Sequence, residues 1–413
     1  MAITDLVEKV RTAWQDGSHC LGIFIDFRKA FDTVNHNILL TKLERLGVRG
    51  IVLKLFKSYL ENRTQYVVFG NAESNSKKVE TGVPQGSILG PLLFIVYIND
   101  LPNASSFFEY IFFADDSNTF ASAKDKKELH DQATRELGKL SSWFSHNRLS
   151  LHYEKLEFMN FSKTNRGIDS QELPLEIDGK AIRRVQETKF LGVALDKNIT
   201  WRKHISMVVQ KLSQTIGIIG RARIFKDTPQ LALLYNTMVL PHLQYCLVNW
   251  GNFKEDRNLK LRDRILRLQK CFLRIIYSAH RLPHADPLFA RLGTLKIDDL
   301  YKQAIRCLSF KLNNNMLPKR IASLASKIKH SHHTRGSQSN LVINSINHQS
   351  LKYIFPHYWN PLPPLLKQST SIGAFKANSK KDLLASYSKF TCTTRNCRSC
   401  LPPPPPPPDP GQF

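Results

Sequence analysis

The sequence lacks any hydrophobic run long enough to cross a membrane, and it is poor in cysteine. Its longest apolar candidate, residues 88–98, falls short of the ~18 residues that a spanning helix needs. The N-terminus has no apolar stretch after a basic start, so it is unlike a secretory signal. Seven cysteines in 413 residues do not form a disulfide framework. These absences predict a reduced intracellular protein without a membrane partner, and they leave nucleus and cytoplasm both open.

Acidic residues are scarce in the second half of the chain. Residues 201–413 hold 33 lysines and arginines against 9 aspartates and glutamates, whereas residues 1–200 hold 26 against 25. Nearly all of the formal net charge of +25 therefore lies in the C-terminal half. This asymmetry favours a polyanionic partner, first of all nucleic acid.

Short apolar runs alternate with amphipathic stretches in the first 200 residues, a pattern typical of an α+β fold. Hydrophobic residues make up 42% of the chain, which is enough for a sizeable core. We expect strands at 20–27, 64–69, 77–80, 149–161 and 188–195, an acidic-tipped hairpin at 107–122, and helices at 36–46, 51–60, 87–99 and 124–145.

Beyond residue 200 the pattern is mostly helical, and the clearest helix is expected at 257–277. After residue 390 come three cysteines and then seven consecutive prolines, which predict an extended polyproline tail. We therefore expect three parts: an α+β domain at 1–200, a helical basic region at 201–390 and a disordered tail at 391–413.

Three aspartates lie in apolar surroundings where an ionised carboxylate is costly unless it is paired or binds a cation. Asp26 ends the run GIFID, and Asp115 and Asp116 interrupt the run around FFADD. Oxygen ligands suit Mg²⁺, with Mn²⁺ as the other ion, and two such ions catalyse phosphoryl transfer. Strand alternation favours Asp26 and Asp115 as the main ligands, with Asp116 assisting. On these residues alone, a hairpin tip with solvated aspartates stays open.

The order of the motifs along the chain favours a metal site over a hairpin tip with solvated aspartates. Asp26 is followed by FRKAFDTV, then by GVPQGSILGPLLF at 82–94 and FADD at 113–116, with LSLHYEKLEFMNF at 149–161 and FLGVALDKNITWRKHI at 190–205. This set resembles the reverse transcriptases of non-LTR retrotransposons, the LINE-type, jockey-like elements. The resemblance covers nearly the whole chain up to about residue 390.

The resemblance implies a right-hand polymerase, with a palm of a small antiparallel sheet backed by helices and then a helical basic thumb. In such enzymes the carboxylates corresponding to Asp26, Asp115 and Asp116 bind the catalytic metals. The primer 3′-hydroxyl then attacks a deoxynucleoside triphosphate, with RNA as template and DNA as primer. The implied activity is that of an RNA-directed DNA polymerase.

The resemblance also assigns residues around the nucleotide. Phe27 and Phe31 follow Asp26, and Phe31 matches the aromatic gate that would crowd a ribose 2′-hydroxyl. Gln85 and Gly86 belong to the loop beside the templating base pair, and Lys155 matches the residue that would protonate the departing pyrophosphate. A core aromatic at Phe31 and a solvated lysine at Lys155 are the structural alternatives.

The expected helix at 257–277 carries a row of basic residues that could hold the template–primer by its phosphates. A solvated helix face is the structural alternative. The residues expected to bind nucleic acid are Arg257, Lys260, Arg264, Arg267, Lys270 and Arg274.

Only 25 residues precede Asp26, whereas the family has a fingers subdomain there. We therefore expect a truncated copy without fingers or endonuclease that is weakly active or inactive alone; the alternative is a non-catalytic nucleic-acid-binding remnant. Cys392, Cys397 and Cys400 supply three of the four ligands that zinc needs, so a zinc knuckle and exposed thiols both stay open. The oligomeric state is not predicted.

Overall fold

The structure is a computed structural model that describes residues 1–163, 173–253, 258–279, 285–325, 340–342 and 348–388. The predicted tail at 391–413, with its three cysteines, lies outside these residues. The chain divides into two compact units. We call Lys9–Ile199 the N-terminal unit, and Thr200 onward together with Ile3–Glu8 the C-terminal unit. Each unit is described by itself.

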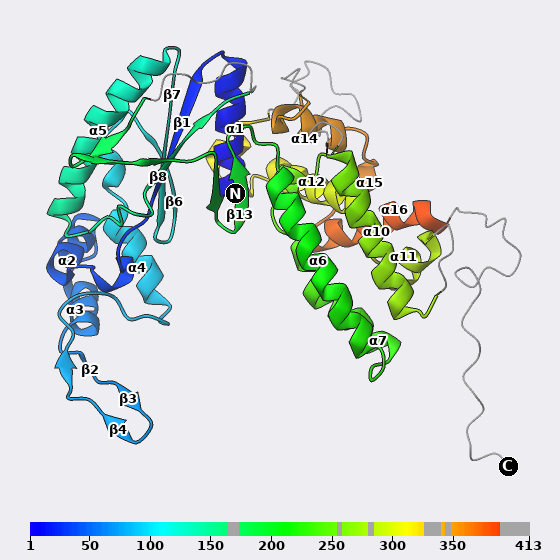
Figure 1. Ribbon diagram of the computed structural model, residues 1–413, viewed down its shortest axis with the longest axis horizontal. Coiled ribbons are helices and arrows are strands. Elements are labelled where there is room, and N and C mark those ends of the chain that lie inside the picture. Colours follow the sequence, from blue (N-terminus) through cyan, green and yellow to red (C-terminus); the bar gives the residue numbers. More distant parts are fainter. Residues whose placement is uncertain (164–172, 254–257, 280–284, 326–339, 343–347, 389–413) are drawn as a thin grey trace, which may run out of the picture. The chain divides into compact units, whose positions relative to one another are not determined.

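The N-terminal unit is built on a five-stranded sheet with the order β11-β8-β1-β7-β6 (Figure 1). Its strands are β1 (His19–Ile25), β6 (Glu109–Phe113), β7 (Asp116–Ala123), β8 (Glu157–Phe161) and β11 (Arg183–Arg184). β1 lies in the middle and is antiparallel to both β7 and β8, while β11 is parallel to β8. After its first residue every side chain of β1 is buried, as its uninterrupted apolar run predicts.

Helices accompany the sheet in this unit. They are the part of α1 (Ala2–Gln15) from Lys9 onward, α2 (His36–Arg45), α3 (Gly50–Leu60), α4 (Leu89–Ile98) and α5 (Lys126–His146). α5 runs along the sheet and contacts β1 and β7 (Figure 1). The Asp125 side chain begins this helix by accepting a hydrogen bond from the Glu128 backbone N–H (2.7 Å). Leu129, Ala133 and Leu137, spaced one turn apart, are buried toward the core.

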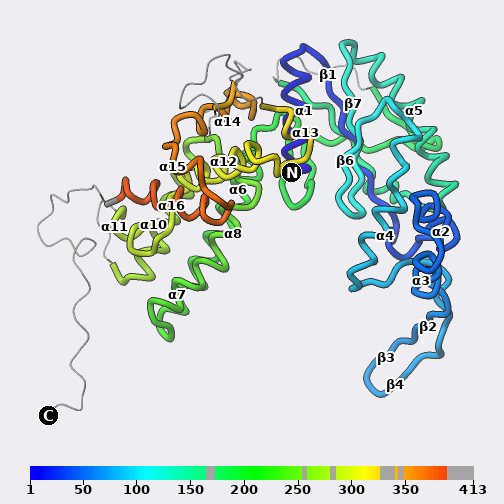
Figure 2. The backbone as a smooth tube through the Cα atoms, turned by 180° about the vertical axis from the view of Figure 1, so that it is seen from behind, coloured from blue at the N-terminus to red at the C-terminus, as the bar shows by residue number. Residues whose placement is uncertain are grey.

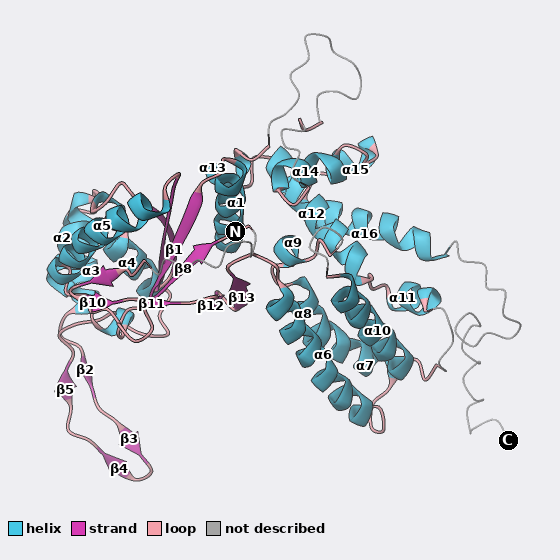
Figure 3. Cartoon of the chain, turned by 45° about the horizontal axis from the view of Figure 1, so that its top comes forward, coloured by secondary structure: helices cyan, strands magenta, loops and turns pink. Residues whose placement is uncertain are grey.

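A thin two-stranded ribbon follows α3 (Figure 3). β2 (Thr64–Gln65) pairs with β5 (Lys77–Lys78), and β3 (Val68–Phe69) pairs with β4 (Ala72–Glu73). The segment between the strands expected at 64–69 and 77–80 is therefore not a simple turn, because β4 lies inside it. Gly70 has φ 61°, which allows a two-residue turn directly after β3.

Four further short strands precede the C-terminal unit. They are β9 (Glu176–Ile177), β10 (Lys180–Ala181), β12 (Glu187–Phe190) and β13 (Val193–Asp196). β12 and β13 form the hairpin where a strand was predicted at 188–195. Of the stretch 149–161, by contrast, only 157–161 is regular strand.

The C-terminal unit is predominantly helical, as predicted. Its longer helices are α6 (Arg202–Ala222), α7 (Thr228–Leu234), α10 (Leu259–Ile276), α11 (Asp286–Leu292), α12 (Ile297–Asn313), α14 (Leu351–Trp359) and α16 (Ile372–Ser388), and its short ones are α8 (Leu240–Gln244), α9 (Leu247–Trp250), α13 (Lys319–Ala322) and α15 (Pro364–Lys367). α12 packs against both α14 and α16 (Figure 2). Phe310 of α12 stacks on Phe375 of α16 with ring centroids 4.6 Å apart, beside the buried Trp359.

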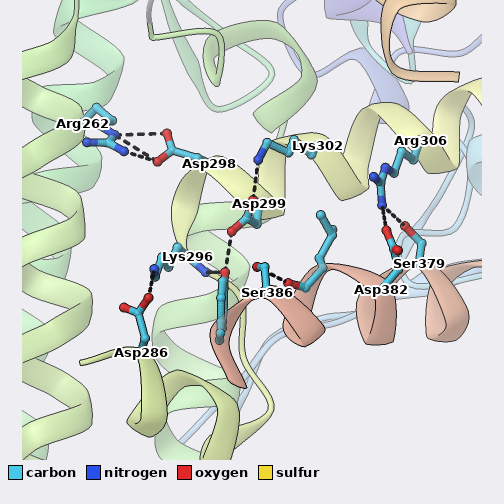
Figure 4. Close-up of polar contacts among 12 residues, drawn as sticks. Arg262, Asp286, Lys296, Asp298, Asp299, Lys302, Arg306, Ser379, Asp382 and Ser386 are labelled. Atoms are coloured by element: carbon cyan, nitrogen blue, oxygen red, sulfur yellow. Dashed lines mark hydrogen bonds and ion pairs between the residues drawn. The ribbon is translucent and has the colours of Figure 1, made fainter. Parts of the chain in front are cut away.

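Polar contacts join the helices of this unit (Figure 4). The Tyr387 hydroxyl donates to the buried carboxylate of Asp299 (2.5 Å) and accepts from the Lys296 backbone N–H (3.0 Å). Arg262 of α10 binds both carboxylate oxygens of Asp298. Among the described residues, no helix is both long enough and apolar enough to span a membrane.

Candidate active site

The pairing of β1 with β7 brings Asp26 near Asp116. Ile25 is the last residue of β1 and pairs with Ser117, so Asp26 directly follows the paired strand and Asp116 is next to its last partner. In the hairpin, Phe113 pairs with Asp116, which leaves Ala114 and Asp115 as a two-residue turn. The choice of Asp26 and Asp115 as the main metal ligands, with Asp116 assisting, stays a prediction. The hairpin puts Asp115 at its tip and makes Asp116 the first residue of β7.

The turn depends on an unusual backbone conformation at Ala114. Its φ is 52°, in the left-handed region that residues with a side chain rarely adopt, at a cost on the order of 1–3 kcal/mol. A positive φ at the first position of a two-residue turn suits the twist of a hairpin. The pairing of β6 with β7 imposes this turn, which places two adjacent carboxylates at the end of the sheet.

The three carboxylates influence one another electrostatically. The pKa of Asp116 is raised from its ordinary value by partial burial, and further by the negative charges of Asp115 and Asp26. Within the described residues, however, no three His, Cys, Asp or Glu side chains come close enough together to hold one metal ion. The donors are of the oxygen type that Mg²⁺ prefers, and their repulsion is what a cation would relieve. The residue types thus fit a divalent ion, although their side chains do not form a tight cluster.

Lys155 lies beside the first of these carboxylates. Its ammonium nitrogen is 3.0 Å from Oδ2 of Asp26. A turn at residues 153–155 carries it there. The segment just before this turn is fixed beside Asp26, because the His152 backbone N–H donates to the Asp26 carbonyl oxygen (2.9 Å) and Phe27 forms a β-bridge with Leu151. The predicted catalytic lysine and the predicted metal ligand are therefore neighbours.

The loop at 82–86 is held against the segment that follows Asp26. The Gln85 side-chain amide donates to Oδ1 of Asp32 (2.7 Å), and Nε2 of His36 donates to the Gly82 carbonyl oxygen (2.8 Å). Gly82 has φ 89°, and a Cβ there would lie 2.8 Å from the Asp32 backbone, so a side chain does not fit. Neither Asp32 nor His36 was predicted from the sequence to belong to this site. Asp32 could have been noticed, because it is the remaining acidic residue of the FRKAFD segment.

The two predicted aromatic residues differ in accessibility. Phe31 is half-buried, and its ring lies 5.0 Å from that of Phe94. Phe27 is buried in the core, with its ring edge-on to Phe144 at 5.3 Å. Only Phe31 presents part of its ring for contact with a ligand. Gly86 is exposed, with φ 80° and open space where a Cβ would lie.

Residues 2–195 match the family model described as reverse transcriptase (RNA-dependent DNA polymerase). These residues are a reverse transcriptase domain. The match takes in the three aspartates, the loop at 82–86 and Lys155.

Known relatives of this reverse transcriptase domain come from mobile elements. The chain is 28% identical over 257 residues to the probable RNA-directed DNA polymerase from transposon BS of Drosophila melanogaster, covering 60% of this chain and 28% of that protein. It is 26% identical over 260 residues to the RNA-directed DNA polymerase from mobile element jockey of the same organism, with the same coverage. The predicted resemblance to LINE-type reverse transcriptases is confirmed. The chain spans less than a third of the length of these relatives.

Among solved structures, apo telomerase from Candida tropicalis is similar at 11% identity and a TM-score of 0.37, covering 76% of this chain and 54% of that one. A likeness this low carries no argument about the present chain.

Outside the reverse transcriptase domain, α10 carries the predicted basic residues in one row. Their spacing sets them within one broad stripe of the helix, opposite the buried Ile265, Phe272 and Ile276. Arg257 lies outside the described residues. We call the remaining five the basic stripe: Lys260, Arg264, Arg267, Lys270 and Arg274.

Proposed function

We propose that this chain carries out RNA-templated DNA synthesis as part of a retrotransposon, with the N-terminal unit acting as a polymerase palm and the C-terminal unit as a thumb. The observation that carries the proposal is the pairing of β1 with β7, which brings Asp26 at the end of β1 near Asp116 and the hairpin tip at Asp115, within a reverse transcriptase domain. Carboxylates at the ends of adjacent strands suit two-metal nucleotidyl transfer.

Asp26, Asp115 and Asp116 would hold Mg²⁺ or Mn²⁺, which when bound supplies charge neutralisation and activation of the primer hydroxyl. Lys155 has a separate role. Its ammonium group lies 3.0 Å from Asp26 and is largely exposed, so it can donate a proton to the departing pyrophosphate.

The deoxynucleoside triphosphate would lie between the Phe31 ring and the loop at 82–86. Gln85 is anchored by Asp32, so its amide is oriented before a nucleotide binds. The buried Phe27 would support this site by packing rather than by touching the nucleotide.

The basic stripe on α10 would bind the phosphates of the RNA template and DNA primer. Its cations lie on the face of the helix away from the core. When they neutralise phosphates, counterions condensed on the nucleic acid are released, which favours binding at low salt.

The first experiment measures thermal unfolding of the full chain with Mg²⁺, a deoxynucleoside triphosphate and an RNA–DNA primer–template, together with primer extension. We expect the three ligands together to raise the melting temperature more than any one alone. The double variant Asp115→Asn, Asp116→Asn should lose the part of the rise in melting temperature that depends on Mg²⁺ and nucleotide. Glu109→Gln is the matched control, because it removes a carboxylate from the same sheet at its pair with Lys9 (2.7 Å).

A second candidate function is non-catalytic binding of nucleic acid. It is favoured by the absence, among the described residues, of a tight three-ligand group, while the basic stripe is in place. Stabilisation by primer–template that is unaffected by Mg²⁺, by nucleotide and by the aspartate variants would support this function and overturn the polymerase proposal.

A further inference from the structure

The turn between α6 and α7 exposes two large apolar side chains. Ile224 is 77% exposed and Phe225 is 81% exposed. The turn has a defined backbone, because the Phe225 N–H donates to the Ala222 carbonyl oxygen (3.0 Å) and the Asp227 side chain accepts from the Gln230 N–H (3.0 Å) as the cap of α7. The apolar pair is thus held outward by ordered structure. We call residues 221–226 the knuckle.

Cations surround the apolar pair. Arg221, Arg223 and Lys226 are all exposed and lie within four residues of Phe225. The nearest carboxylate along the chain, Asp227, accepts the capping hydrogen bond of α7. The knuckle therefore complements a partner that offers both negative charge and flat apolar faces. Single-stranded nucleic acid has both, in its phosphates and its unpaired bases.

We propose that the knuckle is a binding site for single-stranded nucleic acid, in which Phe225 stacks on a base and the flanking arginines contact the adjacent phosphates. The choice of nucleic acid over an anionic membrane rests on the proposed function. It is supported by the packing of α6 and α7 against α10, the helix that bears the basic stripe (Figure 1). The knuckle is a separate site, because it belongs to the turn rather than to that stripe.

The experiment is fluorescence anisotropy of the full chain with a labelled RNA oligonucleotide and with an abasic strand of the same length. Phe225→Ala should weaken binding to the intact RNA by roughly fivefold or more, the range for loss of one base–aromatic stack. On the abasic strand, wild type and Phe225→Ala should bind equally, because no base is left to stack. Phe225→Trp should restore binding to the intact strand.

Two further variants separate charge and exposure from stacking. Arg223→Ala should weaken both strands alike and reduce the salt dependence of log K by about 0.7. Leu365→Ala removes a similarly exposed apolar side chain (84%) from α15 of the same unit. This control should leave the affinity for both strands and its salt dependence unchanged. All these positions are on the surface, so the melting temperature should be unchanged.

The proposal is overturned if Phe225→Ala binds the intact RNA like wild type, or loses as much affinity on the abasic strand. It is also overturned if the variant loses binding only to phosphatidylserine-containing vesicles, which would indicate a membrane site. If wild type extends primers and Phe225→Ala binds RNA as tightly as wild type, the knuckle proposal is refuted and the polymerase proposal stands. If Phe225→Ala loses affinity only for the intact RNA and wild type shows no Mg²⁺-dependent extension, the knuckle proposal stands and the polymerase proposal is refuted.

Discussion

Asp26→Asn should separate a metal-ligand role from a structural one, because the structure makes the stability cost of this change small. The Asp26 side chain is 34% exposed and its partner Lys155 is 65% exposed. An ion pair this open contributes at most about 1 kcal/mol. The backbone hydrogen bond from His152 to the Asp26 carbonyl oxygen is unaffected by the substitution.

The substitution also removes one of the negative charges that raise the pKa of Asp116. A carboxyl whose pKa is higher in the folded than in the unfolded protein binds its proton more tightly when folded. Its contribution therefore destabilises the fold at high pH, and stability falls as the pH rises above the ordinary Asp value of 3.8. In Asp26→Asn this fall should be shallower.

The lost ion pair and the relieved repulsion act in opposite directions. Without divalent ions, the free energy of unfolding of Asp26→Asn at pH 7 should therefore stay within about 1 kcal/mol of wild type, a shift of about 2–4 °C in melting temperature. Wild type with Mg²⁺ at about ten times its dissociation constant should gain about 1.4 kcal/mol, or about 3–6 °C. Asp26→Asn should lose this gain.

Thermal unfolding followed by circular dichroism between pH 4 and 8, with and without Mg²⁺, measures both effects. Glu109→Gln again serves as the control and should keep the full gain from Mg²⁺. The reasoning is refuted if Asp26→Asn keeps that gain as well. It is also refuted if the variant melts far below wild type in the absence of divalent ions, because Asp26 would then be a structural residue.

The remaining predictions concern the loop, the helix contacts and the basic stripe. Gly82→Ala should lower the free energy of unfolding by about 1–3 kcal/mol in urea titrations, because the added Cβ would meet the Asp32 backbone at a residue with positive φ. Gly217→Ala on α6, where nothing lies near the added Cβ, should raise the free energy of unfolding by about 0.5–1 kcal/mol. Equal effects of the two substitutions would contradict the close contact at Gly82. Tyr387→Phe should cost about 1–3 kcal/mol, since the buried carboxylate of Asp299 loses the donor to one of its oxygens and keeps only Lys302 on the other. An unchanged melting temperature would refute this. Arg267→Ala should reduce the slope of log K against log salt concentration for nucleic-acid binding by about 0.7–0.9, without loss of stability. Arg262→Ala on the same helix removes the ion pair with Asp298, so it should lower the free energy of unfolding by about 1 kcal/mol and leave that slope unchanged. Equal salt dependences in these two variants would argue against the basic stripe.

The elements that the sequence predicts best are those whose burial is complete along one strand or one helix face. The run CLGIFI becomes β1 within one residue of the expected start, because every one of its side chains is buried. Helix α2 begins at His36 as expected, with Asn35 accepting a hydrogen bond from the Ile38 N–H (3.1 Å). In both, the signal is local and nothing distant competes with it.

Contacts between distant segments leave no such local signal. Glu8 looks like a surface residue of an amphipathic helix, but it is only 3% exposed. Its carboxylate accepts hydrogen bonds from the Ser350 hydroxyl (2.8 Å) and from the Leu351 N–H (3.2 Å), residues more than 340 positions later. No periodicity in either segment points to the other. The placement of Ile3–Glu8 in the C-terminal unit was accordingly not predicted.

The candidate site lies between these two cases. The apolar neighbours of Asp26, Asp115 and Asp116 in the sequence single these residues out, but in the structure Asp115 and Asp116 are exposed. The places of the last two depend on where the two-residue turn falls, at Ala114 and Asp115, where Ala114 has φ 52°. A turn displaced by one residue would exchange the two aspartates, but it would also turn the flanking apolar side chains to the other face of the sheet. The apolar pattern therefore predicts carboxylates at the end of this hairpin, and the position of the turn sets which of them belongs to β7.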